Sequence, residues 1–219
     1  MMIRPFGFHE FLFLVESTRW TLVLTLAAMT AGGLLGLGIA LARVSRNRIL
    51  RECTRTYIAV VQGIPVLMVL FLSYFGLAHA GLELPPIVAA SIALSVYSSA
   101  YLGDIWRGAI QSVPRQQWEA SASLALTRKQ QYQHVILPQS IKIAVPPTVG
   151  FLVQLVKNTS IVSIVSVVEL TRAGQLMNNI TFEPFRVFIA VALIYLSICY
   201  PLSRISRRLE EKFRVYRHS

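Results

Sequence analysis

Residues 20–42 read WTLVLTLAAMTAGGLLGLGIALA, and this stretch between Arg19 and Arg43 decides the fold. It contains no charged side chain. A helix of about 20 residues crosses the roughly 30 Å hydrocarbon core of a bilayer, so the stretch is long enough to span a membrane. The sequence therefore predicts an all-α integral membrane protein.

Four further stretches are low in charge and long enough to cross a bilayer. Residues 6–15 are apolar but too short to cross, and we expect them to form an interfacial helix ahead of the first span. The whole chain, 1–219, is then one membrane domain. Its five expected spans lie at residues 20–42, 57–80, 85–106, 146–168 and 185–203, and a polar loop occupies residues 107–145.

The charge distribution predicts how the chain is oriented. Of the 219 residues 54% are hydrophobic and 14% charged, and 21 Lys and Arg against 10 Asp and Glu leave a net charge of +11. Alternate segments between the expected spans hold 16 and 4 of the basic residues. Because basic loops favour the cytoplasm, we expect the N-terminus outside, the C-terminus inside, and the lipid bilayer rather than nucleic acid as the partner of this charge.

The first expected span carries small residues at helical spacing. Ala28, Gly32, Gly36 and Ala40 recur every four residues and so share one helix face. A face of this kind lets another helix approach closely, and it offers no group that could bind a ligand. We therefore expect it to be a packing surface.

The loop at 107–145 is too polar to span and predicts a cytoplasmic helix-turn-helix. Pro114 suits a first helical position, Thr127-x-x-Gln130 is a capping-box pattern, and Pro138 is expected to end the second helix. Trp118, Ala122 and Leu126 are expected to share one apolar face. That face either fills a groove on another protein or packs back onto the spans of this chain.

The same loop carries a family pattern. Glu119-Ala120-Ser121, then Ala125, then Val135-Ile136-Leu137-Pro138 resemble the EAA loop of importer permeases of the ATP-binding cassette class. That pattern is Glu-Ala-Ala, three residues, Gly, nine residues and Ile-x-Leu-Pro. This chain has Ser121 for the second Ala, and Ala125 for the Gly, although Ala adopts positive φ less readily than Gly.

The resemblance covers roughly residues 18–213 and is closest to polar amino-acid permeases. Residues 57–67, YIAVVQGIPVL, are similar to a segment with Arg-Gly-Thr-Pro-Leu-Leu, with Gln62 for the Arg and Ile64 for the Thr. The other matching motifs are Tyr101-Leu102-Gly103-Asp104-Ile105-Trp106-Arg107-Gly108, Gln111-Ser112-Val113-Pro114, Gln117-Trp118-Glu119-Ala120 and Lys157-Asn158-Thr159-Ser160.

This resemblance implies a multi-pass permease of the bacterial inner membrane that imports polar amino acids or related zwitterions. Its expected partners are an ATPase dimer, a second permease chain, identical or related, and an extracytoplasmic substrate-binding protein. The ATPase would bind ATP and Mg, and this chain no cofactor. The residues expected to couple to the ATPase are Trp118, Glu119, Ala120, Ser121, Ala125, Leu126, Leu137 and Pro138.

Polar residues inside the expected spans are candidates for a substrate path. Lys157 lies near the middle of the fourth expected span, where an unpaired charge costs a few kcal/mol or more. It either pairs with a carboxylate such as Asp104 or lines the path. The candidate path residues are Gln62, Tyr97, Ser98, Asp104, Gln154, Lys157, Asn158, Thr159 and Ser160.

Two other functions were weighed against transport driven by a partner ATPase. Lys157 and Asp104 could relay ions in a secondary transporter. An integral-membrane enzyme acting on lipids would need a catalytic motif such as His-Glu-x-x-His or Gly-x-Ser-x-Gly, and neither is present. The sequence also has no Gly-x-x-x-x-Gly-Lys-Ser/Thr loop, so we expect no ATP hydrolysis by this chain.

Overall fold

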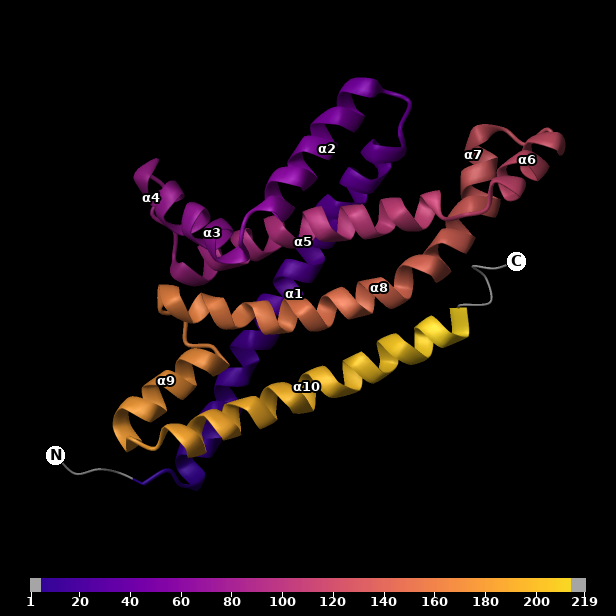
Figure 1. Ribbon diagram of the computed structural model, residues 1–219. Helices are drawn as coiled ribbons and strands as arrows, with labels where there is room; N and C mark the ends of the chain where they lie inside the picture. Colours follow the sequence, from indigo (N-terminus) through magenta and orange to yellow (C-terminus); the bar gives the residue numbers. More distant parts are fainter. Residues whose placement is uncertain (1–4, 214–219) are drawn as a thin grey trace.

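The computed structural model describes residues 5–213, and its regular elements are all helical. The termini at 1–4 and 214–219, which belong to the predicted single domain, lie outside the described residues. Four long helices form the body: α1 (Phe8–Val44), α5 (Pro86–Gln111), α8 (Leu137–Asn158) and α10 (Pro184–Phe213). In Figure 1, α5, α8 and α10 run side by side and α1 crosses them.

Shorter elements connect these helices. A hairpin leads from α1 into α2, a helical elbow joins α5 to α8, and α9 joins α8 to α10 (Figure 1). The shorter elements are α2 (Arg48–Gly63), α3 (Val66–Phe71), the π-helical turn η1 (Leu72–Gly76), α4 (Leu77–His79), α6 (Arg115–Ser123), α7 (Arg128–Gln130), the π-helical turn η2 (Gln131–Ile136), the 3₁₀ segment η3 (Thr159–Val165) and α9 (Leu170–Thr181).

Helices long and apolar enough to cross a membrane number four among the described residues, or five if one bent pair counts as a span. The predicted spans at 20–42 and 185–203 lie within α1 and α10, and the one at 85–106 lies within α5 except for Pro85, which precedes that helix. Each helix extends beyond its predicted span, and α10 continues through Pro201 to Phe213.

Residues 8–15 are helical and lead into the first span, as expected, and their interfacial position stays a prediction. They belong to α1, which is continuous from Phe8. The Glu10 carboxylate accepts a hydrogen bond from the Gly7 backbone N–H at 3.0 Å and so caps the first turn. No Pro or Gly interrupts the chain between Phe8 and the first span, so the helix has no reason to break.

The predicted span at 57–80 is not one continuous helix, and it counts as a single span only if a bent pair of helices is taken together. The paired segments Arg48–Gly63 and Val66–His79 are bent by 106° relative to each other. Pro65 lacks a backbone N–H and disfavours helical geometry in the residue before it, and Ile64 is accordingly extended, with φ −114° and ψ 147°. Pro65 therefore breaks this segment in its middle.

The fourth span begins earlier than residue 146, and Pro138 does not end a helix. A single helical stretch runs from Arg128 to Val165. The π-helical turn η2 ends directly before α8, whose first turn contains Pro138. Pro138 lacks a backbone N–H, and the π-helical turn directly before it is where the backbone hydrogen bonding of this continuous stretch adapts. The helix therefore continues from the elbow into the membrane.

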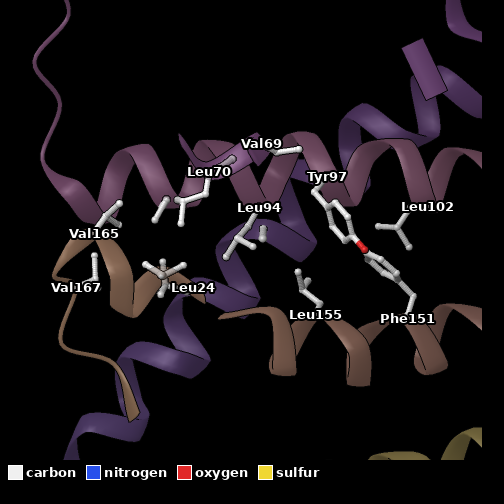
Figure 2. Close-up of a cluster of buried hydrophobic side chains, with 14 residues drawn as sticks. Leu24, Val69, Leu70, Leu94, Tyr97, Leu102, Phe151, Leu155, Val165 and Val167 are labelled. Carbon is white, nitrogen blue, oxygen red and sulfur yellow. The ribbon is translucent and has the colours of Figure 1, made fainter. Parts of the chain in front are cut away.

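The main core lies where α1, α3, α5, α8 and η3 meet (Figure 2). Leu24, Leu94 and Leu155 are almost fully buried there, and the rings of Tyr97 and Phe151 stack at a centroid distance of 6.2 Å. Figure 2 shows these side chains pointing toward one another from separate helices.

The small-residue face of α1 packs against α5, as predicted. All four of its residues are buried. A Cβ atom added at Gly32 would lie 2.5 Å from the Ser98 Cβ, and one added at Gly103 would lie 2.7 Å from the Ile39 Cγ2. The two helix backbones therefore approach as closely as glycine allows.

Candidate functional site

The elbow between α5 and α8 turns through a Schellman motif. The Leu126 N–H donates to the Ser121 carbonyl at 3.3 Å, and the Ala125 N–H donates to the Ala122 carbonyl at 2.9 Å. Ala125 occupies the left-handed position, with φ 55°. This is the position at which the resembling pattern has Gly. The turn is therefore formed here at the cost of placing a Cβ where glycine is favoured.

The second half of the elbow begins with the predicted capping box. The Gln130 N–H donates to the Thr127 Oγ1 at 3.4 Å, and the Thr127 N–H donates to the Gln130 Oε1 at 2.9 Å. The buried Gln131 side chain closes the turn by donating to the Leu126 carbonyl at 2.9 Å. Both helix ends of the elbow are thus satisfied by local hydrogen bonds, which favours a defined geometry.

Trp118 faces the chain itself and is not an exposed anchor. Its ring packs edge-on against Tyr132 at a centroid distance of 5.1 Å and borders a small core of Ile110, Val113 and Ile136. The predicted apolar face could fill a groove on another protein or pack onto this chain, and Trp118 does the second. This core fixes the elbow to the ends of α5 and α8.

The outer surface of the elbow is formed by other residues. Glu119 and Ala120 are exposed, and the Glu119 Oε1 lies 2.8 Å from the Arg115 Nε. Leu124 is 75% exposed at the tip, and sequence reasoning missed it. Its position directly before the left-handed residue is the signal that could have found it. Among the other predicted coupling residues, Ala125 and Pro138 are exposed, Leu126 and Leu137 are half-buried, and Ser121 is buried.

A polar strip lies on the exposed side of α8. Gln154 and Lys157 are exposed there, and the Gln154 Nε2 donates to the Asn158 Oδ1 at 3.1 Å. The Asn158 Nδ2 is buried and finds no partner within the described residues. Ser160 is half-buried at the end of the strip and donates to the Lys157 carbonyl at 2.7 Å. A bilayer-crossing helix with such a strip needs protein or water beside it.

The proposed pairing of Lys157 with Asp104 is wrong. The Asp104 Oδ1 accepts from Arg107 instead, at 2.9 Å from Nε and 2.7 Å from Nη2. These two residues border a cavity of about 760 Å³ between the ends of α5, α8 and α10. Asp104 is therefore held by its own helix, and Lys157 has no carboxylate partner among the described ion pairs.

The other predicted path residues do not gather at one place. Ser98 is buried against Gly32 in the α1–α5 contact, and Thr159 is buried and donates to the Val156 carbonyl at 2.8 Å. Tyr97 is buried against Tyr101 and Phe151. Gln62 is half-buried next to the break at Pro65. The strip on α8 is therefore the part of the predicted path that the fold leaves accessible.

Glu169 is a buried site that sequence reasoning missed. It caps α9 by accepting from the Arg172 N–H at 2.9 Å, and it is completely buried. Its second oxygen accepts from the Tyr195 hydroxyl at 2.9 Å and from the Thr21 Oγ1 at 3.3 Å. This carboxylate therefore connects α1, α9 and α10. A Glu directly ahead of a helix-forming segment is an N-cap signal that could have indicated it.

Comparison with protein families gives one match. Residues 32–215 match the family described as the binding-protein-dependent transport system inner membrane component. Among curated proteins, the chain is 37% identical to the probable amino-acid ABC transporter permease protein YckA of Bacillus subtilis (strain 168), over 95% of this chain and 92% of that one. It is 35% identical to the probable glutamine ABC transporter permease protein GlnM of the same organism, over 94% and 97%.

Among solved structures the fold is similar to a chain of the crystal structure of an amino acid ABC transporter with histidines. The TM-score is 0.86 at 34% identity, and the similarity covers 91% of this chain and 94% of that one. The two folds therefore agree over about nine tenths of this chain.

Proposed function

This chain belongs to the family of binding-protein-dependent transport system inner membrane components and is a permease subunit of an ATP-binding cassette importer, and we propose that it imports polar amino acids. It is a transport subunit without catalytic activity of its own, placed in the inner membrane. This assignment replaces the two other functions weighed above, the secondary transporter and the lipid-modifying enzyme. The names of its relatives support an amino acid or a related zwitterion as the substrate.

The elbow is proposed to dock on a partner ATPase at the cytoplasmic side. One observation carries this assignment: the elbow is a locally satisfied turn, anchored on the core by Trp118, that presents Glu119 and Leu124 outward. A rigid helix with one charge and one apolar side chain suits a cleft on another protein. The elbow belongs to the set of alternate segments between the spans that holds 16 of the basic residues. This excess supports an N-terminus outside and a C-terminus inside.

The polar strip on α8 is proposed to line the substrate path against a second permease chain. Lys157 donates only and offers a charge for a carboxylate, while Gln154 and Asn158 offer both donors and acceptors. A zwitterion needs both kinds of partner. Since the strip is exposed on this chain, a second copy or a related chain would enclose it, with a substrate-binding protein delivering the substrate from outside.

The mechanism is then a mechanical one. The partner ATPase subunits bind ATP and Mg, and their closure on ATP moves the docked elbow. Because η2 and α8 continue the elbow as one helix from Arg128 to Val165, a displacement of the elbow is carried directly into the membrane. The strip around Lys157 would thereby open alternately to the two sides.

The test uses the importer complex reconstituted in proteoliposomes with its ATPase and binding protein. Glu119→Lys reverses a charge on the outer surface of the elbow, and breaking the exposed Arg115–Glu119 pair costs only about 0.2–1 kcal/mol of stability. We expect loss of ATPase stimulation and of co-purification with the ATPase, with normal membrane insertion. Glu16→Lys is the control, because Glu16 is similarly exposed and paired with Arg19 on α1.

Unchanged stimulation and co-purification in Glu119→Lys would contradict the docking assignment. A separate measurement addresses the substrate: uptake of radiolabelled glutamine and of other polar amino acids by the same proteoliposomes. Uptake that follows an imposed ion gradient without ATPase would contradict the proposal that the partner ATPase drives transport through the elbow.

A further inference from the structure

An apolar groove of about 770 Å³ lies between α1, α5 and α8, away from the polar strip of α8. Leu34, Leu37 and Leu41 of α1 form one wall. The polar groups of the opposite wall are satisfied within the protein, since the Trp106 Nε1 donates to the Thr148 Oγ1 at 2.9 Å and that hydroxyl donates to the Ala144 carbonyl. The groove thus presents an apolar surface alone.

A second, basic pocket adjoins the groove near the C-terminal end of α1. It has a volume of about 260 Å³ and is lined by Arg43 and Arg51, among others, and Ile110 borders both cavities. The Arg43 Nη1 donates to the Arg51 carbonyl at 3.2 Å. The Arg43 Nε and the Ser45 Oγ are buried and find no hydrogen-bond partner within residues 5–213. Both atoms are enclosed by the protein itself, so what the pocket offers a ligand is the positive charge of Arg43 and Arg51.

We propose that the groove and the basic pocket together bind one anionic phospholipid, with an acyl chain along α1 and the phosphate at Arg43, Ser45 and Arg51. The order of the two cavities matches that of a lipid: the groove lies beside the uncharged part of the span, and the pocket at its basic end. The positive charge of Arg43 and Arg51 is complementary to a phosphate, and charge-assisted hydrogen bonds from guanidinium groups to phosphate are strong.

The bound lipid would also contact the elbow. Trp118 and Tyr132, which anchor the elbow, line the basic pocket together with the two arginines. A phosphate held there connects the end of α1, the start of α2 and the base of the elbow. The inference goes beyond the proposed transport function, because it concerns a site outside the substrate path.

The experiment measures lipid retention by native mass spectrometry of the full chain, purified with its partner subunits in detergent. Phosphatidylglycerol, phosphatidylcholine and glycerol 1-phosphate are titrated separately. We expect phosphatidylglycerol to be retained and glycerol 1-phosphate not, since the acyl chain adds free energy with every buried methylene. Arg43→Gln should weaken phosphatidylglycerol retention about fivefold, the effect of one basic side chain near a lipid surface.

A second variant avoids the contacts that Arg43 makes within the fold. A Cβ at Gly33 would meet the Trp106 Cη2 at 3.7 Å and the Leu102 Cδ1 at 3.9 Å, which are ordinary contacts, so Gly33→Leu should fill the groove without unfolding the chain. Gly38→Leu is the matched control, because a Cβ at Gly38 meets nothing within 4 Å and Gly38 borders neither cavity. Arg204→Gln is the control for charge.

We expect Gly33→Leu and Arg43→Gln to lose phosphatidylglycerol, and both controls to keep it. Equal retention by Gly33→Leu and Gly38→Leu would overturn the acyl-chain assignment. Equal retention of phosphatidylcholine and phosphatidylglycerol, or equal binding of glycerol 1-phosphate, would overturn the proposal of an anionic lipid. A change in oligomeric state of Gly33→Leu with unchanged lipid retention would assign the groove to a second copy of the chain instead.

Discussion

Ala125 carries a measurable backbone strain. A non-glycine residue in the left-handed region costs about 1–2 kcal/mol of folding free energy. Glycine removes this cost, but it also raises the conformational entropy of the unfolded chain, which destabilises the fold by about 0.5–1 kcal/mol. We expect Ala125→Gly to stabilise the elbow by roughly 0.5–1 kcal/mol. Hydrogen exchange of the α6 amides should then slow about two- to fivefold, since 1.4 kcal/mol corresponds to a factor of ten.

Ala122→Gly provides the matched control for this prediction. Ala122 is also exposed but lies inside α6, where glycine costs about 0.5–1 kcal/mol relative to alanine. Exchange in the same helix should therefore become faster. If both variants changed exchange in the same direction, the assignment of strain to the Ala125 position would be wrong.

Glu169 should show energetic coupling to Tyr195. Glu169→Ala removes the cap of α9 and leaves the Tyr195 hydroxyl without its carboxylate, and we expect a loss of about 1–3 kcal/mol. Tyr195→Phe alone should cost about 1–2 kcal/mol. Because the two residues share one hydrogen bond, the double variant should cost at least about 0.5 kcal/mol less than the sum in detergent unfolding. Strict additivity would contradict a direct contribution of this bond.

Among the helices, the crossing of α1 over α5 is the feature most sensitive to side-chain size. Gly32→Ala places a Cβ 2.8 Å from the Ser95 carbonyl oxygen as well as against Ser98, and backbone cannot move aside. We expect a loss of about 1–3 kcal/mol in unfolding experiments. Gly38→Ala on the same helix meets no neighbour and should be neutral or slightly stabilising. Equal effects of the two would contradict close helix contact at Gly32.

The packing face of α1 was predictable because spacing alone places small residues on one side. The sequence did not predict the bend at Pro65, nor that a helix continues through Pro138. Both prolines interrupt backbone hydrogen bonding, but only tertiary context decides whether the helix ends or adapts. Here Pro138 falls in the first turn of α8 directly after the π-helical turn η2, whereas Ile64 adopts an extended conformation before Pro65.

The candidate sites show a similar division. The capping box at Thr127 follows from local chemistry, and the sequence pattern predicted it. The left-handed position of Ala125 was indicated only by the Gly of the resembling pattern, since Ala itself disfavours positive φ. Asp104 pairs with Arg107 three residues along its own helix, a local spacing that the sequence also offers. The partners of Glu169 do not follow in this way, because Thr21 is 148 positions away in sequence. Such long-range contacts depend on the crossing angle of α1, which no local pattern encodes.

Taken as a whole, the molecule separates its lipid-facing and polar surfaces onto different helices. Leu34, Leu35 and Leu37 of α1 are at least half exposed, as are Leu193 and Leu196 of α10, and hydrocarbon suits all of them. The exposed side of α8 instead carries Gln154 and Lys157. A single chain would place this charge against lipid at high cost, so the arrangement favours an assembly in which a second chain covers α8.

Lys157→Met tests whether this charge serves transport. If Lys157 holds the carboxylate of the substrate, its removal forfeits a charge-assisted hydrogen bond worth about 1.5–3 kcal/mol, so uptake should fall about 10- to 150-fold. The ATPase should still co-purify, because the elbow is unchanged. The measurement is uptake per molecule of inserted permease in proteoliposomes, with Lys212→Met as the control for loss of a lysine elsewhere. Normal uptake at normal insertion would assign Lys157 to packing between chains, since a charge that only holds two subunits together does not discriminate among substrates.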